Sequence, residues 1–258
     1  MIRIGRDSDR FVKENIILRT QRGSRVYGTN ITPELADKHD LDVSDKDYMS
    51  IIIPPLNYHI GMPKALGNFE STNIGEEEVH SLKKYMKLAA KCNPNVLECL
   101  FVEPKHIDIL TPMGQTLIEN RKIFLSKRAF NAYGGYGRAQ REKMLTKRAN
   151  KTGRQYLVKK YGYDTKFAMH MIRLLRQGRE ILGGFGLHPE RHDAEELLAI
   201  RLGEYSLEEV LDLYDKEDKL LKKALQHSKL PKKADMNAIE KLCMELHHEF
   251  FRPLAWMT

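Results

Sequence analysis

A pair of aspartates stands at the head of an apolar run, and this arrangement restricts what the chain can form. Asp45 and Asp47 are two residues apart, and the segment from Met49 to Ile53 that follows them reads as a strand. Because side chains alternate between the two faces of a strand, both carboxylates point to the same side. Two carboxylates held side by side can bind Mg²⁺, which prefers oxygen ligands and keeps substrate phosphates in its shell. The pair therefore predicts a strand with a metal site at its start.

A tight turn precedes this pair in the chain. Gly23-Ser24 allows a backbone to approach a phosphate closely and offers amides and a hydroxyl as donors. Either motif alone is weak, since most Asp pairs lie in solvated turns and most Gly-Ser pairs mark only a turn. Their order along the chain, turn first and carboxylates next, favours one cleft that holds both. Together they predict metal-assisted transfer of a nucleotidyl group.

Longer stretches carry a family resemblance. Most of the chain, from about residue 16 to the C-terminal helices, resembles one branch of predicted nucleotidyltransferases in the DNA polymerase β superfamily. The segments that carry this resemblance are Gly23-Ser24-Arg25-Val26-Tyr27-Gly28, Ser44-Asp45-Lys46-Asp47-Tyr48, Phe124-Leu125-Ser126-Lys127-Arg128 and Tyr161-Gly162-Tyr163-Asp164-Thr165-Lys166. The resemblance implies a Mg²⁺-dependent enzyme, with Mn²⁺ as the alternative ion. It also implies a nucleoside triphosphate donor such as ATP.

The sequence departs from that branch around residues 31–43. About ten extra residues separate the Gly-Ser turn from the carboxylate pair, and such insertions usually form surface loops. The insertion creates a rival pair, Asp40 and Asp42. We prefer Asp45 and Asp47, because they keep register with Tyr48 and the motifs that follow. The residues after Tyr48 are Met-Ser, where the branch has Arg-Gly, so no role of that arginine carries over.

The third carboxylate of the metal site has two candidates. Glu76 and Glu78 would share a face with His80 in an extended chain. The alternative is an acidic entrance to a helix over Val79 to Ala90, because acidic residues are favoured in a first helical turn. Glu78 is the preferred ligand and catalytic residue beside Asp45 and Asp47.

A cationic stripe is expected in the second half of the chain. Lys166, His170 and Arg173 are spaced at i, i+4 and i+7, which places them on one face of a helix. Such a stripe would suit a triphosphate or its pyrophosphate leaving group. For His170, a purely structural histidine is an equal alternative. The resemblance adds further nucleotide-binding candidates, which are Gly23, Ser24, Arg25, Tyr27 and Lys127.

The pattern changes in character near residue 122. Residues 1–122 mix short strands with helices, which predicts an α+β nucleotidyltransferase core with a small mixed sheet. Residues 123–258 have helical spacing almost throughout, which predicts a helical domain that closes the active-site cleft. The composition, with 41% hydrophobic and 30% charged residues, is that of a folded chain. Three cysteines without a CxxC pair, no membrane-length apolar run and a charged N-terminus favour a cytoplasmic protein.

The positive charge is concentrated in one segment. Residues 121–160 contain 13 Lys or Arg and one acid, Glu142, whereas acids dominate residues 189–223. This segment predicts a groove for a phosphate-bearing ligand, which is the triphosphate, an RNA end or both. The alternative is a solvated helix whose arginines pair with the acidic half. The net charge of +8 favours an anionic partner without choosing among them.

These observations predict a nucleotidyltransferase that moves a nucleoside monophosphate from a triphosphate to a hydroxyl acceptor and releases pyrophosphate. The acceptor is an RNA, a protein or a small molecule. The alternative is a nucleotide- or RNA-binding protein that keeps this fold without turnover. The acceptor, the base preference and the oligomeric state are not determined by the sequence.

Overall fold

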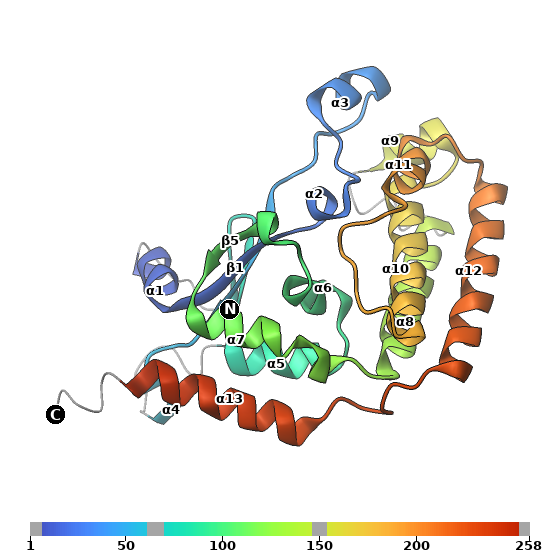
Figure 1. Ribbon diagram of the computed structural model, residues 1–258. Helices are drawn as coiled ribbons and strands as arrows, with labels where there is room; N and C mark the ends of the chain where they lie inside the picture. The colour runs from blue at the N-terminus through green and yellow to red at the C-terminus, as the bar shows by residue number, and fades with distance from the viewer. Residues whose placement is uncertain (1–6, 61–69, 146–153, 253–258) are drawn as a thin grey trace.

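The computed structural model describes residues 7–60, 70–145 and 154–252. Within them, five strands form a mixed sheet in the order β3-β4-β2-β1-β5 (Figure 1). The strands β2 and β4 are parallel, and the other neighbouring pairs are antiparallel. The strands are β1 (Ile16–Arg22), β2 (Asp47–Ile52), β3 (Ser71–Ile74), β4 (Glu77–Ser81) and β5 (Ile107–Leu110).

The sheet register brings three polar residues to one face. Arg22 of β1 lies opposite Asp47 of β2, and Glu78 of β4 lies opposite Met49. Because Asp47 and Met49 are two residues apart on one strand, Arg22, Asp47 and Glu78 all point to the same side. The apolar core lies on this side as well, since Met49 and Ile51 are buried there. The polar residues therefore stand where the core ends.

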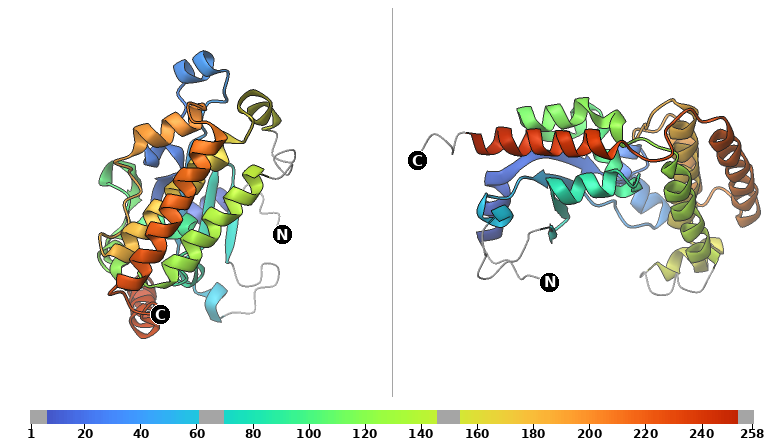
Figure 2. Two further views of the ribbon diagram at one scale, coloured as in Figure 1. Left: turned by 90° about the vertical axis from the view of Figure 1, so that its right-hand side faces the viewer. Right: turned by 90° about the horizontal axis from the view of Figure 1, so that it is seen from below.

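Helices cover both faces of the sheet. The helix α1 (Asp7–Asn15) packs its Val12 against Ile52 and Val79 on one face. On the other face lie α5 (Leu82–Ala89), α6 (Pro94–Leu97) and α7 (Pro112–Glu119). The C-terminal helix α13 (Met236–Phe251) contacts α5 and α7, so the end of the chain returns to the N-terminal half (Figure 2).

The predicted helix over Val79 to Ala90 is wrong at its start. The chain from Glu77 to Ser81 is the strand β4, because it pairs with β2 along its whole length. The helix α5 begins at Leu82, where the Ser81 side chain accepts a hydrogen bond from Lys84 N. Local pattern could not separate the two states, since acidic residues suit a first helical turn as well as an extended segment.

The second half of the chain is a stack of helices. The long helices α8 (Arg128–Leu145), α10 (Thr165–Gly183) and α12 (Leu207–His227) lie side by side (Figure 1). The shorter helices α9 (Gln155–Tyr161) and α11 (Ala194–Leu202) both contact α10. Asp164 caps the start of α10 by accepting from Lys166 N and Phe167 N. A buried arginine, Arg176, ties this stack together through Asp193, Glu196 and Glu217.

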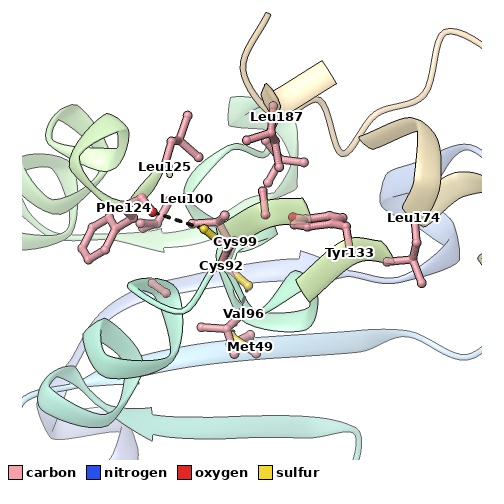
Figure 3. Close-up of a cluster of buried hydrophobic side chains, with 14 of the residues drawn as sticks. Met49, Cys92, Val96, Cys99, Leu100, Phe124, Leu125, Tyr133, Leu174 and Leu187 are labelled. Atoms are coloured by element: carbon pink, nitrogen blue, oxygen red, sulfur yellow. Dashed lines mark hydrogen bonds between the residues drawn. The ribbon is translucent and has the colours of Figure 1, made fainter. Parts of the chain in front are cut away.

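One continuous apolar core joins the two halves. Figure 3 shows Met49 of β2, Cys99, Tyr133 of α8 and Leu174 of α10 in one view, and Cys99 Sγ lies 3.2 Å from Met49 Sδ. All four residues belong to the same buried cluster. The α+β class with a small mixed sheet followed by a mostly helical region is confirmed. The division of the chain at residue 122 stays a prediction.

The segment 31–43 forms structure of its own. Its helix α3 (Pro33–His39) starts at Thr32, whose side chain accepts from Leu35 N, with proline at the first helical position. Ile31, Ala36 and Leu41 are buried against Leu157 of α9 and against Leu202 of α11. The interpretation of this insertion as a surface loop is wrong, because it is a helix that docks on the helical half.

Short helical turns connect these elements. They are α2 (Ser24–Tyr27), α4 (Asn57–Ile60) and three 3-10 turns, at Glu98–Leu100, Pro104–His106 and Arg121–Phe124. None of the described helices combines the length and the apolar character that a membrane span requires. The described cysteines are all unpaired, as expected for reduced thiols.

Candidate active site

A cleft of about 1080 Å³ lies between the sheet and the helical half. The sheet half contributes the Gly-Ser turn and the carboxylate pair to its wall. The opposite wall is made by α8, α10 and α11. The insertion adds Asp42 and Val43 at one end, and Ser44, which follows them, also lines the cleft. The two predicted motifs, which are more than 20 positions apart in the sequence, therefore meet at one opening.

The turn and the second aspartate are in direct contact. Gly23 has a φ of 78°, a conformation that favours glycine, and it leads into α2. A Cβ atom on Gly23 would lie 2.8 Å from Asp47 Oδ2, closer than real contacts allow. The absence of a side chain at Gly23 is therefore what lets the carboxylate and the turn share one space. Both Gly23 and Ser24 line the cleft.

The carboxylates of Asp45 and Asp47 face the cleft without a partner. Neither makes a hydrogen bond or an ion pair with any residue that the structure describes. On the opposite wall lies Lys166, whose pKa these two carboxylates raise while burial lowers it more. Two free carboxylates at one opening are oxygen donors of the kind that a hard divalent cation prefers. The residues therefore fit one part of a metal site.

The third carboxylate does not join this pair. Among the described residues no group of three acidic, histidine or cysteine side chains is close enough to hold a metal. Glu78 shares the face of Asp47, but it is ion-paired with Arg22, and its Oε1 lies 2.9 Å from His80 Nε2. The His80 ring, and after it Arg22, lower the pKa of Glu78 to about 2 despite partial burial. Glu76 lies exposed in the turn before β4. Neither glutamate lines the cleft.

The predicted cationic stripe lies on α10 and faces the cleft. Lys166, His170 and Arg173 all line it. The ammonium group of Lys166 has no hydrogen-bond partner among the described residues. Burial, and after it Arg173 and Lys166, lower the pKa of His170 well below its ordinary value, so its ring is neutral at pH 7. The structure thus brings the three side chains to the wall opposite the carboxylates.

Arg173 differs from the other two in its partners. Its guanidinium is 3.8 Å from the centre of the Tyr27 ring and donates to Glu98 and to Gln177. The hydroxyl of Tyr27 donates to the second oxygen of Glu98 at 2.6 Å. Arg173 is only 3% exposed, so these contacts make it part of the cleft floor. Its role in phosphate binding stays a prediction.

Two other predicted nucleotide-binding residues lie apart from the cleft lining. Arg25 is on α2 and does not line the cleft. Lys127 lies just before α8, and its backbone N–H donates to Pro231 O in the segment before α13. The structure therefore brings Gly23, Ser24 and Tyr27 to the cleft with the α10 stripe, whereas Arg25 and Lys127 lie outside it.

Sequence reasoning missed two arginines at the cleft. Arg154 stands at the start of α9, and its Nε lies 3.0 Å from Asp164 Oδ2. Arg201 belongs to α11, is 6% exposed and lines the same end of the cleft. The sequence did contain a signal for Arg201, because this arginine lies one helical turn after the buried Leu197, on the apolar side of α11. A charged residue on such a face is rare without a partner or a ligand.

The basic segment 121–160 divides between two surfaces, and its residues 146–153 lie outside the described part. On α8, Tyr136 and Lys143 line the cleft together with Asn131. Arg141 turns the other way and lies over the Tyr214 ring of α12, at 5.1 Å from its centre. Which of the two interpretations of this segment holds stays open, because Arg141 contacts a tyrosine ring and not an acid.

A mixed sheet that presents a Gly-Ser turn and an aspartate pair to a cleft walled by helices defines a protein of the nucleotidyltransferase type. Residues 3–245 match the RNA repair pathway DNA polymerase beta family, and the chain belongs to this family. The membership supports a nucleotidyltransferase-type function. Polymerase β-like nucleotidyltransferases generally use divalent metals.

The chain is also similar to a phage protein. It is 30% identical over 138 residues to an uncharacterized 38.9 kDa protein of the nrdC-mobD intergenic region of Enterobacteria phage T4. The match covers 49% of this chain and 38% of the phage protein. The chain thus spans well under half of the length of that relative.

Proposed function

We propose that this protein is a metal-dependent nucleotidyltransferase that moves a nucleoside monophosphate from a nucleoside triphosphate to a hydroxyl acceptor. The observation that carries the proposal is the contact of Gly23 with the Asp47 carboxylate, with Asp45 free in the same cleft. A phosphate that approaches the Gly23-Ser24 backbone would stand beside both carboxylates. Family membership supports the same class of reaction.

Asp45 and Asp47 would hold the metal, which is Mg²⁺ or Mn²⁺. Bound there, the ion would neutralise phosphate charge and lower the pKa of the acceptor hydroxyl. Two carboxylates leave room for water and phosphate oxygens in an octahedral shell. Glu78 is a poorer candidate than the aspartates, because its ion pair with Arg22 would have to be broken first.

The remaining cleft residues would bind and orient the triphosphate. The amides of Gly23 and Ser24 would donate to its phosphate oxygens, and Lys166 would offset the charge of the leaving pyrophosphate. In the transfer, the acceptor oxygen forms a bond to the α-phosphorus while the bond from that phosphorus to the bridging oxygen breaks. The free ammonium group of Lys166, opposite the aspartates, supports this orientation.

An RNA acceptor is favoured over a protein or a small molecule. The family's description refers to an RNA repair pathway. On α8, Tyr136 and Lys143 border the cleft and offer a stacking ring and a phosphate partner. A phosphate backbone lying along α8 would bring the end of the RNA to the carboxylates.

A second candidate is a nucleotide- or RNA-binding protein without turnover. One observation favours it, namely that Glu78 is engaged by Arg22 and His80 and leaves two carboxylates instead of three. In such a protein the triphosphate would bind without transfer of label.

The test is incubation of the protein with Mg²⁺, each α-labelled nucleoside triphosphate, and RNA or protein acceptors. Asp45→Asn and Asp47→Asn are expected to lower transfer by roughly 10²–10³-fold, the usual loss of an electrostatic catalytic group. The exposed Asp215 on α12 provides the control Asp215→Asn, which should transfer normally. Transfer that persists in both cleft variants would overturn the site. Binding without any transfer by the unaltered protein would support the second candidate.

A further inference from the structure

Three cations gather at the end of the cleft beside the insertion helix. They are Arg154 at the start of α9, Lys166 in the first turn of α10 and Arg201 on α11. All three line the cleft. Their charges act on one another, since Arg201 and Arg154 both lower the pKa of Lys166 after burial does. The cluster therefore concentrates like charges in a small and partly enclosed space.

Arg201 is the most buried member of this cluster. Its residue is 6% exposed, and its Nη1 is buried without a hydrogen-bond partner among the described residues. A buried donor that lacks a partner costs free energy, and more so when the group is charged. Burial is the main cause that lowers the pKa of Arg201. A charged donor held in this way at the wall of a cleft calls for an anionic ligand.

Two of the acids beside the cluster already have partners. Asp164 is shared between Arg154 Nε and the start of α10. Asp42 accepts from the hydroxyl of Tyr156 at 2.9 Å. Both carboxylates therefore have partners of their own, and neither accepts a hydrogen bond from Nη1 of Arg201.

The position of Lys166 orients the cluster relative to the carboxylate pair. Asp45 and Asp47 both influence its pKa, and so do Arg154 and Arg201. Lys166 thus lines the cleft within electrostatic reach of the aspartates and of the two arginines. A ligand with a metal-bound phosphate at the aspartates and further phosphates beyond it would extend from one group to the other.

We propose that Arg154, Lys166 and Arg201 form the binding site for the terminal phosphates of the nucleoside triphosphate. This assignment rests on the proposed function, because it takes the α-phosphate to lie at Asp45 and Asp47. A triphosphate fits better than an RNA backbone, because Arg201 is almost completely buried and the end of the cleft is bordered by the insertion. A chain end can enter such a site, whereas a continuous polyanion needs an open groove.

The insertion borders this end of the cleft through Asp42 and Val43. Leu41 and Ile31 pack on Leu157 and Leu202, and Asp42 is bonded to Tyr156. These contacts join the insertion to α9 and α11, which carry Arg154 and Arg201. The insertion is therefore packed against the two helices that carry the arginines.

The test compares Arg201→Met and Arg154→Met with the unaltered protein in calorimetric binding of inorganic tripolyphosphate, ATP, AMP and a 5′-phosphorylated RNA oligonucleotide. Each variant is expected to bind tripolyphosphate and ATP about tenfold or more weakly, because losing one charged hydrogen bond usually has this effect. AMP and the oligonucleotide should bind as before. Lys241→Met, an exposed residue of α13, is the charge-matched control.

Three further results decide the assignment. Equal affinity of tripolyphosphate for all proteins would overturn it, and so would a loss confined to the oligonucleotide, which would assign the cluster to an RNA end. Arg201→Lys keeps the charge and should recover part of the affinity, which a merely misfolded variant would not. A thermal melt of each variant checks that it is folded.

The failure of this inference differs from the failure of the proposed function. Tripolyphosphate binding measured without Mg²⁺ does not need the aspartates, so Asp45→Asn should retain it. If the unaltered protein transfers no label but Arg201→Met still lowers tripolyphosphate binding, the phosphate site is supported and the proposed transfer reaction is refuted. If transfer is normal and tripolyphosphate binding is unchanged in Arg201→Met, the phosphate site alone is refuted.

Discussion

Gly23 and Asp47 are in such close contact that a Cβ atom on the glycine would lie 2.8 Å from Asp47 Oδ2. The contact joins a turn that can bind phosphate to a carboxylate that can bind metal. It depends on two features of Gly23, namely its positive φ of 78° and its lack of a side chain. The geometry of the proposed site can therefore be tested at this one residue.

Gly23→Ala is expected to lose most transfer activity, because the new Cβ would displace the Asp47 carboxylate. The matched control is Gly184→Ala, at a glycine with a φ of 84° and no atom within 4 Å of its would-be Cβ. Both substitutions strain the backbone by about 1 kcal/mol or more. Both should therefore lower stability in denaturant unfolding, but only Gly23→Ala should abolish transfer. A fully active Gly23→Ala protein would contradict the proposed role of this contact.

Glu78→Gln is expected to make the free energy of unfolding depend less on pH in the acid range. The pKa of Glu78 is about 2 in the folded protein, below the value near 4.3 of an unfolded chain. Folding therefore favours the ionised form, so its contribution is complete above about pH 4.3 and is lost as the pH falls toward 2. At pH 7 the variant should be about 1 kcal/mol less stable, since the ion pair with Arg22 is partly exposed.

Denaturant unfolding between pH 7 and pH 3 checks the pH effect, and the difference between the two proteins should shrink as the pH falls. Glu76→Gln is the control, because Glu76 is exposed in the same segment. A difference that stays constant down to pH 3 would show that Glu78 acts through packing instead of charge.

Arg173→Met is expected to cost roughly 3–5 kcal/mol, because it leaves the buried Glu98 carboxylate without its cation. The double variant Arg173→Met with Glu98→Gln removes both charges and should recover a large part of the lost stability. Chemical unfolding measures the two costs. Transfer assayed in the double variant then separates a structural role of Arg173 from a role in phosphate binding. If Arg173 serves only packing, activity should return together with stability.

Leu157→Ala is expected to loosen the insertion helix. Leu157 is fully buried beneath Ile31, Ala36 and Leu41, and such a truncation costs about 2–5 kcal/mol. Limited trypsin digestion should then cut faster at Lys38, which is exposed on α3. Leu246→Ala truncates an equally buried leucine of α13 and should lower stability without faster cleavage at Lys38. Equal cleavage rates in the two variants would mean that α3 is not held by α9.

The sequence by itself determined the features that depend on short-range pattern. The apolar run predicted the strand β2, which begins at Asp47, two residues after Asp45, and helical spacing put Lys166, His170 and Arg173 on one face of α10. Strand and helix periods span only a few residues, so a single sequence is enough to recognise them. The α+β class followed from the same patterns.

Only the tertiary structure decided which side chains meet across the chain. The register of β1, β2 and β4 turned Glu78 toward Arg22, and the packing of α10 on the sheet half turned Arg173 toward Glu98. The meeting of Arg154 and Arg201 at one end of the cleft likewise depends on α9 and α11. Such contacts join residues tens of positions apart, and no local period encodes them. Their partners are fixed by burial and by charge, which act only after the elements have packed.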